Sequence, residues 1–421
     1  MPPSGDSAAR PSGDSAARPS AAARRARLWL TAAVIAGYLP AVGVPLRRWL
    51  DFAAFYAGGQ LAGTTHLLDP VAVVLLQASE GIPPTPFVSP PFVAVAYAPL
   101  AALPYDLAAI VQVAVMLAAL VGGAALWGDA LGLPRRWAVL GALAWGPASA
   151  SVVSGQIDTL VLLLTGLAVR FLASGRRVPA GVAIALLACK PQVALGAGVG
   201  ALRRLGAAGL AAVAVVGTAL YGVSALAVGG DLLWPRGWLA TLASYSTPDY
   251  QANGWQASNP VALGIRWWLA SHEPAFVVAG VAVAALVVGL ALGALSSRRG
   301  RAVLAALPAP AAEVALATAL WLVVSPHLWV YDATLLLPAI GLWVVVARRA
   351  GWPRPESILL AGTFVAAALW PLGGVLGLTA LPVVVAGVPL MLARALGLLG
   401  HVAPEGRAAM FPTDSPTSQG E

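Results

Sequence analysis

The sequence contains few charged residues and few residues that form disulfides or bind metals. Only 10% of its 421 residues are charged, against about 25% in a typical soluble domain, and 59% are hydrophobic. The single cysteine, Cys189, cannot form an intrachain disulfide, and the four histidines are scattered rather than grouped at metal-ligand spacing. We therefore expect no metal site and no cofactor. The composition excludes an ordinary soluble enzyme and predicts a polytopic membrane protein.

Lysine is nearly absent, since Lys190 is the only lysine among 25 basic residues. It lies within an apolar stretch at 178–202. A charge inside an apolar segment costs about 2.5–3.5 kcal/mol on membrane-insertion scales, so it persists mainly where it faces a cavity, a partner or a ligand. A lysine near a helix end can instead extend its ammonium group to the lipid headgroups. Lys190 is therefore a candidate functional residue, with headgroup contact as the alternative.

The formal net charge of +8 comes from arginines that flank apolar segments, which is the pattern that sets membrane topology. No basic and aromatic surface motif accompanies these arginines, so we expect no nucleic-acid partner. The chain divides into a basic N-terminal tail at 1–27, a transmembrane domain at 28–400 and a polar C-terminal tail at 401–421. The octapeptide PSGDSAAR occurs twice in the N-terminal tail, which is expected to be disordered.

Apolar segments predict an all-α bundle of about twelve transmembrane helices. They lie at roughly 28–46, 105–127, 138–154, 157–174, 178–189, 192–202, 206–229, 275–296, 308–324, 330–347, 356–371 and 378–397. We expect the two short segments on either side of Lys190 to be helices that meet at Pro191. Five arginine clusters then fall on the cytoplasmic side together with both termini: Arg135-Arg136, Arg176-Arg177, Arg203-Arg204, Arg298-Arg299-Arg301 and Arg348-Arg349.

The same topology places five polar elements on the outer face of the membrane. They lie at 46–91, 154–158, 190–192, 230–274 and 325–327. Because polar residues gather on one side and arginines occupy the other, we expect a chemical site that faces the periplasm or the cell exterior.

Asp51 opens the first outer loop, and the run 51–68 has apolar residues at helical spacing. We expect a helix that lies in the membrane interface, with Asp51 near its N-terminus. An aspartate in that position can also serve only as a helix N-cap. Arg47 and Arg48 break the charge rule on this side. Either the membrane tolerates them or they bind an anion beside Asp51.

A series of short motifs spans roughly residues 28–347. The motifs are Asp51-Phe52 with Tyr56, Pro90-Pro91-Phe92, Ala98-Pro99-Leu100, Gly155-Gln156-Ile157-Asp158, Lys190-Pro191-Gln192 and Ser325-Pro326-His327-Leu328-Trp329. In this order they resemble glycosyltransferase family 87. One departure is that the family tends to show an Asn-Gln-Ser run before an arginine, where this chain has Ser258-Asn259-Pro260 and then Arg266.

The resemblance implies a GT-C-type integral-membrane mannosyltransferase with a polyprenyl-phosphate sugar donor. Asp51 matches the general base that deprotonates the acceptor hydroxyl. The cations available for the donor phosphate are Lys190, Arg48, Arg266 and His327. The residues expected at the sugar or the acceptor are Tyr56, Gln156, Asp158, Gln192 and Asn259. Transfer from a β-linked donor would give an α-linked product on an envelope glycolipid or glycan.

Simpler roles are open for several of these residues. Gln156 and Asp158 can act as helix caps, and His327 can be an interfacial histidine. Asp332, just after the last motif, is expected to pair with a basic group.

Two other functions are open as well. One is a secondary transporter, because about twelve spans is a common transporter size, although no repeat beyond the octapeptide relates two halves. The other is a noncatalytic envelope-assembly protein. The alanine-rich composition, the basic tail and the resemblance together favour the inner (plasma) membrane of an actinobacterium.

Overall fold

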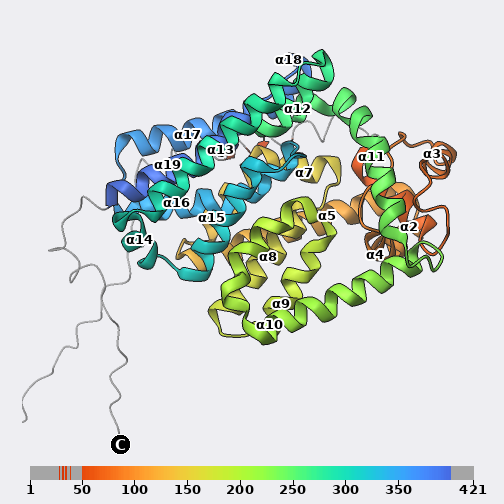
Figure 1. The fold of residues 1–421 in the computed structure, drawn as a ribbon, viewed down its shortest axis with the longest axis horizontal. Helices are drawn as coiled ribbons and strands as arrows, with labels where there is room; N and C mark the ends of the chain where they lie inside the picture. The colour runs from red at the N-terminus through yellow and green to blue at the C-terminus, as the bar shows by residue number, and fades with distance from the viewer. Residues whose placement is uncertain (1–27, 29–30, 33, 36–37, 39–49, 400–421) are drawn as a thin grey trace, which may run out of the picture.

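The computed structural model describes residues 50–399 and, before them, residues 28, 31, 32, 34, 35 and 38. This part of the chain is helical and contains no strand, which confirms the predicted all-α class (Figure 1). Both predicted tails and most of the first predicted span fall outside the described residues. The predicted phosphate ligand Arg48 lies outside them too.

Four stretches are long and apolar enough to cross a membrane. They are α5 (Tyr105–Leu131), Ala194–Ala227 of α10 (Pro191–Ala227), α13 (Ala275–Ser296), and Val330–Arg349, which joins the 3-10 helix η4 (Val330–Leu336) to α16 (Leu337–Arg349). Two bent pairs raise the count among the described residues to six: α6 (Arg135–Leu143) with α7 (Gly146–Ser154), and α17 (Arg354–Ala368) with 370–376.

The predicted count of about twelve spans is therefore not confirmed. Several segments that the sequence suggested as spans form shorter helices of 10–17 residues or helices with a sharp bend. The remaining elements are α2 (Leu50–Leu61), α3 (Pro70–Ser79), α4 (Pro91–Ala101), α8 (Asp158–Ala173), α9 (Arg177–Leu186), η2 (Leu187–Cys189), α11 (Trp234–Asn253), η3 (Gly254–Gln256), α12 (Pro260–Ser271), α14 (Arg298–Ala305), α15 (Ala309–Val324), η5 (Trp370–Leu372), α18 (Gly373–Leu376) and α19 (Leu381–Leu399).

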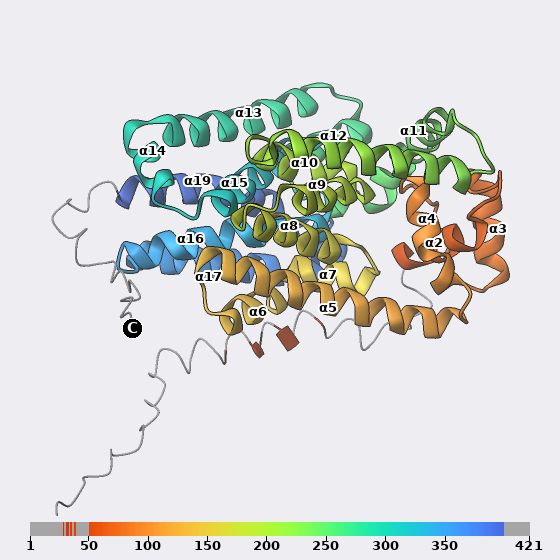
Figure 2. The ribbon, with the colours of Figure 1, turned by 90° about the horizontal axis from the view of Figure 1, so that it is seen from below.

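The long axis of the molecule separates an arginine-rich end from a polar end. Figure 2 shows α14 at one end and α2, α3 and α11 at the other. Arg349 donates to Ala306 O at 3.0 Å, and Arg204 pairs with Glu313 at 2.6 Å, so these arginines lie near the two ends of the short α14–α15 connection. Three of the five predicted arginine clusters thus share one end. The orientation of that end relative to a bilayer stays a prediction.

The predicted break beside Lys190 is confirmed. The 3-10 helix η2 ends at Cys189, Lys190 has an extended backbone with φ −139° and ψ 72°, and α10 begins at Pro191. Proline suits the first turn of a helix because its missing N–H has no intrahelical partner there. The break places the lysine side chain between two helices rather than along one of them.

The predicted helix after Asp51 is present as α2, but its surroundings differ from the expectation. Residues 52, 53 and 55–57 are at most 4% exposed, so α2 is covered on several sides by other parts of the protein. A helix lying in the interface would keep one face toward lipid and one toward water. The interfacial position therefore stays a prediction, whereas the burial of α2 fixes Asp51 at its N-terminus.

Helices α10 and α15 pack closely through glycine. A Cβ atom added to Gly200 would lie 2.7 Å from Val314 Cα, and one added to Gly196 would lie 2.6 Å from Trp321 Cβ. The two glycines are four residues apart and share one helix face, as in small-residue contacts between transmembrane helices. This contact holds the segment after Lys190 against the helix that leads to His327.

We expect Gly200→Ala to destabilise the protein by about 1–3 kcal/mol, because the new methyl group meets the α15 backbone. Gly198→Ala is the matched control on the same helix, where nothing lies within 4 Å. Alanine there should stabilise the helix by about 0.5–1 kcal/mol. Thermal unfolding followed by tryptophan fluorescence in detergent compares the two variants. Equal unfolding midpoints would contradict the close contact.

Candidate active site

Four aspartates converge on one tyrosine. The Tyr331 side chain interacts electrostatically with Asp51, Asp158, Asp249 and Asp332. These carboxylates come from the N-terminus of α2, the N-terminus of α8, the C-terminal part of α11 and η4. They are separated by as many as 281 positions in the sequence (332 minus 51), so the fold itself assembles the cluster.

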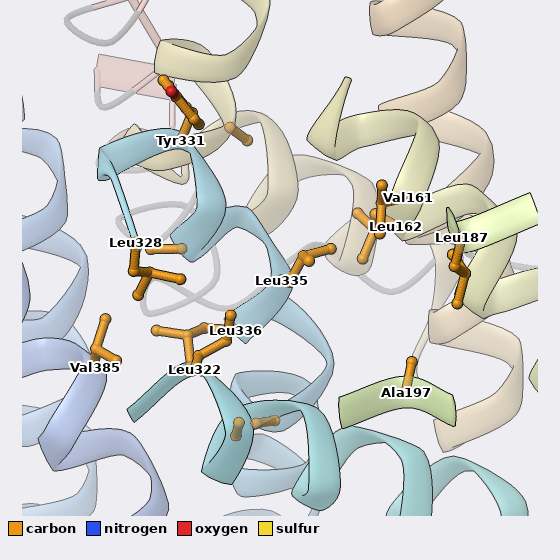
Figure 3. Close-up of a cluster of buried hydrophobic side chains, with 14 of the residues drawn as sticks. Val161, Leu162, Leu187, Ala197, Leu322, Leu328, Tyr331, Leu335, Leu336 and Val385 are labelled. Atoms are coloured by element: carbon orange, nitrogen blue, oxygen red, sulfur yellow. The ribbon is translucent and has the colours of Figure 1, made fainter. Parts of the chain in front are cut away.

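An apolar core supports η4 beneath this cluster. Figure 3 shows Leu328, Leu335 and Leu336 close to Leu322 of α15, with Val161 and Leu162 of α8 on the other side. All seven residues of η4 are buried. A rigid platform of this kind fixes the side chains that η4 directs toward the polar cluster.

Lys190 lies between two buried aspartates. Its Nζ is 2.7 Å from both carboxylate oxygens of Asp158 and 2.7 Å from Asp332 Oδ1. Lys190 is 5% exposed and both aspartates are fully buried. The Nζ atom also lies 4.5 Å from the centre of the Tyr331 ring. The prediction that Asp332 pairs with a basic group is confirmed.

Lys190 donates hydrogen bonds to both carboxylate oxygens of Asp158. Its contact with Asp332 Oδ1 at 2.7 Å is an ion pair in which that oxygen accepts no hydrogen bond. The other oxygen of Asp332 accepts from the Trp329 backbone N–H at 2.7 Å. The cluster therefore joins α8, the start of α10 and η4, and its two carboxylates outnumber its single cation.

Asp51 is half-buried at the N-terminus of α2, which is not one of the candidate membrane spans. Burial raises the pKa of its carboxyl group to about 6, against the lowering effects of Lys190 and of the Gln156 and Ser154 side chains. A carboxylate with this pKa is largely ionised at neutral pH and is a stronger base than an exposed aspartate. Asp51 can therefore accept a proton from a hydroxyl group.

Gly155 allows the segment before α8 to approach Asp51. Its φ is +80°, and a Cβ atom at this position would lie 2.5 Å from the Phe52 Cβ. Only glycine combines this backbone conformation with so close a contact. The Gly155 carbonyl accepts from Gln112 Nε2 at 2.9 Å, which holds the turn in place. Gln156 is thereby brought to the Asp51 carboxylate.

A second polar cluster lies between α11 and the loop before η4. Asp249 Oδ2 lies 3.0 Å from His327 Nε2 and 3.2 Å from Trp329 Nε1. Its Oδ1 accepts from Asn253 at 2.8 Å and from Tyr245 at 3.1 Å. Burial raises the pKa of Asp249, but hydrogen bonds from His327, Asn253 and Tyr245 hold this pKa below its usual range. The His327 side chain is 37% exposed, so it is open to a ligand.

Arg266 lies near this second cluster with its charge uncommitted. It is half-buried on α12, and a Cβ atom at Gly254 would lie 3.0 Å from its Cγ. Gly254 directly follows Asn253, the partner of Asp249. No ion pair joins Arg266 to any of the described residues. The Arg266 guanidinium and the partly exposed His327 ring are therefore well placed to meet an anion.

Three of the expected sugar or acceptor residues have other contacts. Asn259 is fully buried, donates to Leu322 O and Ser325 O at 2.7 Å, and caps α12 by accepting from Ala262 N at 2.7 Å. The Tyr56 hydroxyl donates to Leu103 O at 2.8 Å. Asp158 is occupied by Lys190.

Gln156 therefore remains beside the Asp51 carboxylate. Gln192 lies half-buried at the start of α10, and its backbone carbonyl accepts from Trp321. A ligand role for these two glutamines stays a prediction.

The sequence prediction does not include Asp249. A signal was nevertheless present, because Tyr245, Asp249 and Asn253 recur at four-residue spacing and form one polar face of a helix. Within residues 50–399, no three acidic, histidine or cysteine side chains gather in a group that could hold a metal ion.

The sequence model described as Glycosyltransferase family 87 matches residues 87–326, which is more than half of the chain. The matched range contains Lys190 and Asp249, whereas Asp51, His327 and Asp332 lie outside it. No curated protein and no solved structure matches the chain.

We expect Lys190→Met to destabilise the protein by about 3–5 kcal/mol, because it leaves two buried carboxylates without a cation. Arg204→Met is the matched control, since the Arg204–Glu313 pair is 38% exposed on both sides and an exposed pair is worth about 0–1 kcal/mol. Thermal unfolding measures both variants.

The triple variant Lys190→Met, Asp158→Asn, Asp332→Asn should be more stable than Lys190→Met alone, because it removes the buried charges together. If Lys190→Met unfolds at the same temperature as Arg204→Met, the buried pairing is not a stabilising feature of this fold.

Proposed function

This chain belongs to glycosyltransferase family 87, and on that premise we propose that it is an inverting, lipid-donor glycosyltransferase. It moves a sugar, mannose being the expected one, from a polyprenyl-phosphate donor to a hydroxyl group of an envelope glycolipid or glycan. The half-buried carboxylate of Asp51, which lies beside the Gln156 and Ser154 side chains at the N-terminus of α2, is the observation that carries the proposal. The apolar helices support a donor that resides in the same membrane.

Asp51 is the proposed general base. A transferase of this kind must remove a proton from an acceptor hydroxyl while the new glycosidic bond forms. A carboxylate with a pKa of about 6 is ionised at neutral pH and still basic enough to take the proton. Gln156, beside this carboxylate, is the proposed hydrogen-bonding partner of a sugar or acceptor hydroxyl.

Arg266 and His327 are the proposed ligands of the donor phosphate. Negative charge develops on that phosphate as the anomeric bond breaks, and preorganised cations or donors lower the barrier by meeting it. Arg266 has no carboxylate partner among the described residues, and His327 is 37% exposed. Lys190, which the sequence suggested for this role, already donates to Asp158 and forms an ion pair with Asp332. We therefore propose that it positions η4 and acts on Asp51 through its charge.

The proposed step balances as a single displacement. Asp51 takes the hydroxyl proton, the acceptor oxygen forms a bond to the anomeric carbon, and the bond from that carbon to the phosphate oxygen breaks. The polyprenyl phosphate leaves with the bonding electrons. Attack opposite the leaving group inverts the anomeric configuration, so a β-linked donor gives an α-linked product.

The proposed site faces the periplasm or the cell exterior. The helices that carry Asp51 and Asp249, α2 and α11, lie at the end opposite the arginine-rich α14 (Figure 2). Arginine-rich connections favour the cytoplasmic side. A lipid-linked donor suits the opposite side, where nucleotide sugars are not supplied.

We expect Asp51→Asn to reduce sugar transfer by about 10²–10⁴-fold, because the amide has the same shape but cannot accept the proton. Asp231→Asn, in a different predicted outer segment, is the control and should keep wild-type transfer, since Asp231 is exposed and caps the Leu233 N–H. Transfer from a radiolabelled polyprenyl-phosphate donor in proteoliposomes measures both. Near wild-type turnover of Asp51→Asn would contradict the assignment.

The transfer rate should also report the ionisation of Asp51. The base works in its deprotonated form, so kcat/KM should be flat above its pKa and fall as the pH drops through about 6. The residual activity of Asp51→Asn should lack this acid limb. An unchanged limb in that variant would assign the ionisation to a different group.

A further inference from the structure

The Asp249 carboxylate accepts hydrogen bonds at both oxygens. Oδ1 receives Tyr245 and Asn253, and Oδ2 receives His327 and Trp329. A carboxylate has about four lone-pair positions, so four donors use its capacity. Asp249 is also only 4% exposed. It therefore has neither the access nor the free lone pairs to contact a substrate.

The bond to Asp249 fixes which nitrogen of His327 carries a proton. An ionised carboxylate only accepts hydrogen bonds, so the nitrogen 3.0 Å from Asp249 Oδ2, which is Nε2, must be the donor. The partly exposed ring then presents its other nitrogen, Nδ1, to a ligand. A charged ring donates from Nδ1, which is the geometry that an anionic phosphate requires.

The ring of His327 is also held by its neighbours. The Trp329 ring centre lies 4.6 Å from the His327 ring centre, and the Tyr250 ring lies 6.2 Å away at an angle of 87°. The Tyr250 hydroxyl donates to Pro326 O, and Ser325 Oγ donates to His327 O at 3.0 Å. These contacts fix the loop and flank the ring, and the bond from Nε2 to Asp249 selects the ring nitrogen that faces away from α11.

We infer that Asp249 is a positioning residue that holds His327, with Nε2 protonated, so that Nδ1 meets the phosphate of the lipid donor. This inference rests on the proposed role of His327 at that phosphate. Removal of the buried partner of a metal-binding histidine commonly changes metal affinity or activity about 10–100-fold, and we expect an effect of the same order for a histidine that binds a phosphate. The proposed site therefore includes Asp249 of helix α11, which contacts His327 rather than the substrate.

A double-mutant cycle tests the inference. Asp249→Asn keeps the shape of the side chain and loses its charge, and we expect kcat/KM for the polyprenyl-phosphate donor to fall by about 10–100-fold while the acceptor KM is unchanged. If Asp249 acts through His327, adding Asp249→Asn to His327→Asn should cost less than about twofold more, because the two residues form one unit. Asp231→Asn is again the control, with wild-type kinetics expected.

Multiplicative effects of the two substitutions would overturn the inference, because Asp249 would then act independently of His327. An equal rise in acceptor and donor KM would also overturn it, since that is the result of a general structural loss. If His327→Asn alone has wild-type donor kinetics, the phosphate role of His327 fails, and the inference fails with it.

Nitrogen NMR of histidine-labelled protein tests the pair without any transfer assay. The chain has four histidines, and comparison with His327→Asn assigns the signal of His327. At a pH where the ring is neutral, we expect the proton on Nε2. A neutral ring with its proton on Nδ1 would overturn the inference even if transfer is observed. If wild-type protein transfers no sugar, the proposed function fails, and the tautomer still decides whether Asp249 orients His327.

Discussion

One buried ammonium group joins the parts of the chain on which the site depends. Lys190 contacts Asp158 at the start of α8 and Asp332 in η4, at 2.7 Å in each case. Neither carboxylate would tolerate burial without a cation, because an unpaired buried charge is strongly unfavourable. The break in the helix at Pro191 is what places the lysine there. A continuous helix would have directed Lys190 along one face.

The remaining functional groups are arranged around this ion cluster. Asp332 also accepts from the Trp329 backbone, so the same carboxylate that binds Lys190 fixes the residue two positions after His327. Asp51 reaches the cluster from α2, where Gly155 permits a contact that any side chain would block. The ion cluster therefore interacts with the proposed base, Asp51, and fixes the backbone next to the proposed phosphate ligand His327.

The sequence was most informative where a residue type was out of place. A lysine in an apolar stretch identified Lys190, and Pro191 beside it predicted the helix break. Asp51 and the α2 helix were also predictable. The role of Asn259 could not be read from the sequence, because an asparagine suitable for sugar binding is equally suitable for capping a buried helix start, as it does here. The sequence did not distinguish Asp249 from other acidic residues of the predicted outer loops. Its proposed role depends on a contact with His327, which is 78 residues away in the sequence. The number of spans could not be settled from the sequence, because bent and short apolar helices have the composition of spans.

We propose that a lipid-linked sugar is the donor at this site. Purified protein in proteoliposomes can be given radiolabelled mannose either as polyprenyl-phosphate-mannose or as nucleotide-activated mannose, together with glycolipid acceptors. The account predicts an α-linked labelled glycolipid from the polyprenyl-phosphate donor and none from the nucleotide donor. Label transferred from the nucleotide donor, or no transfer from any polyprenyl-phosphate sugar, would contradict it.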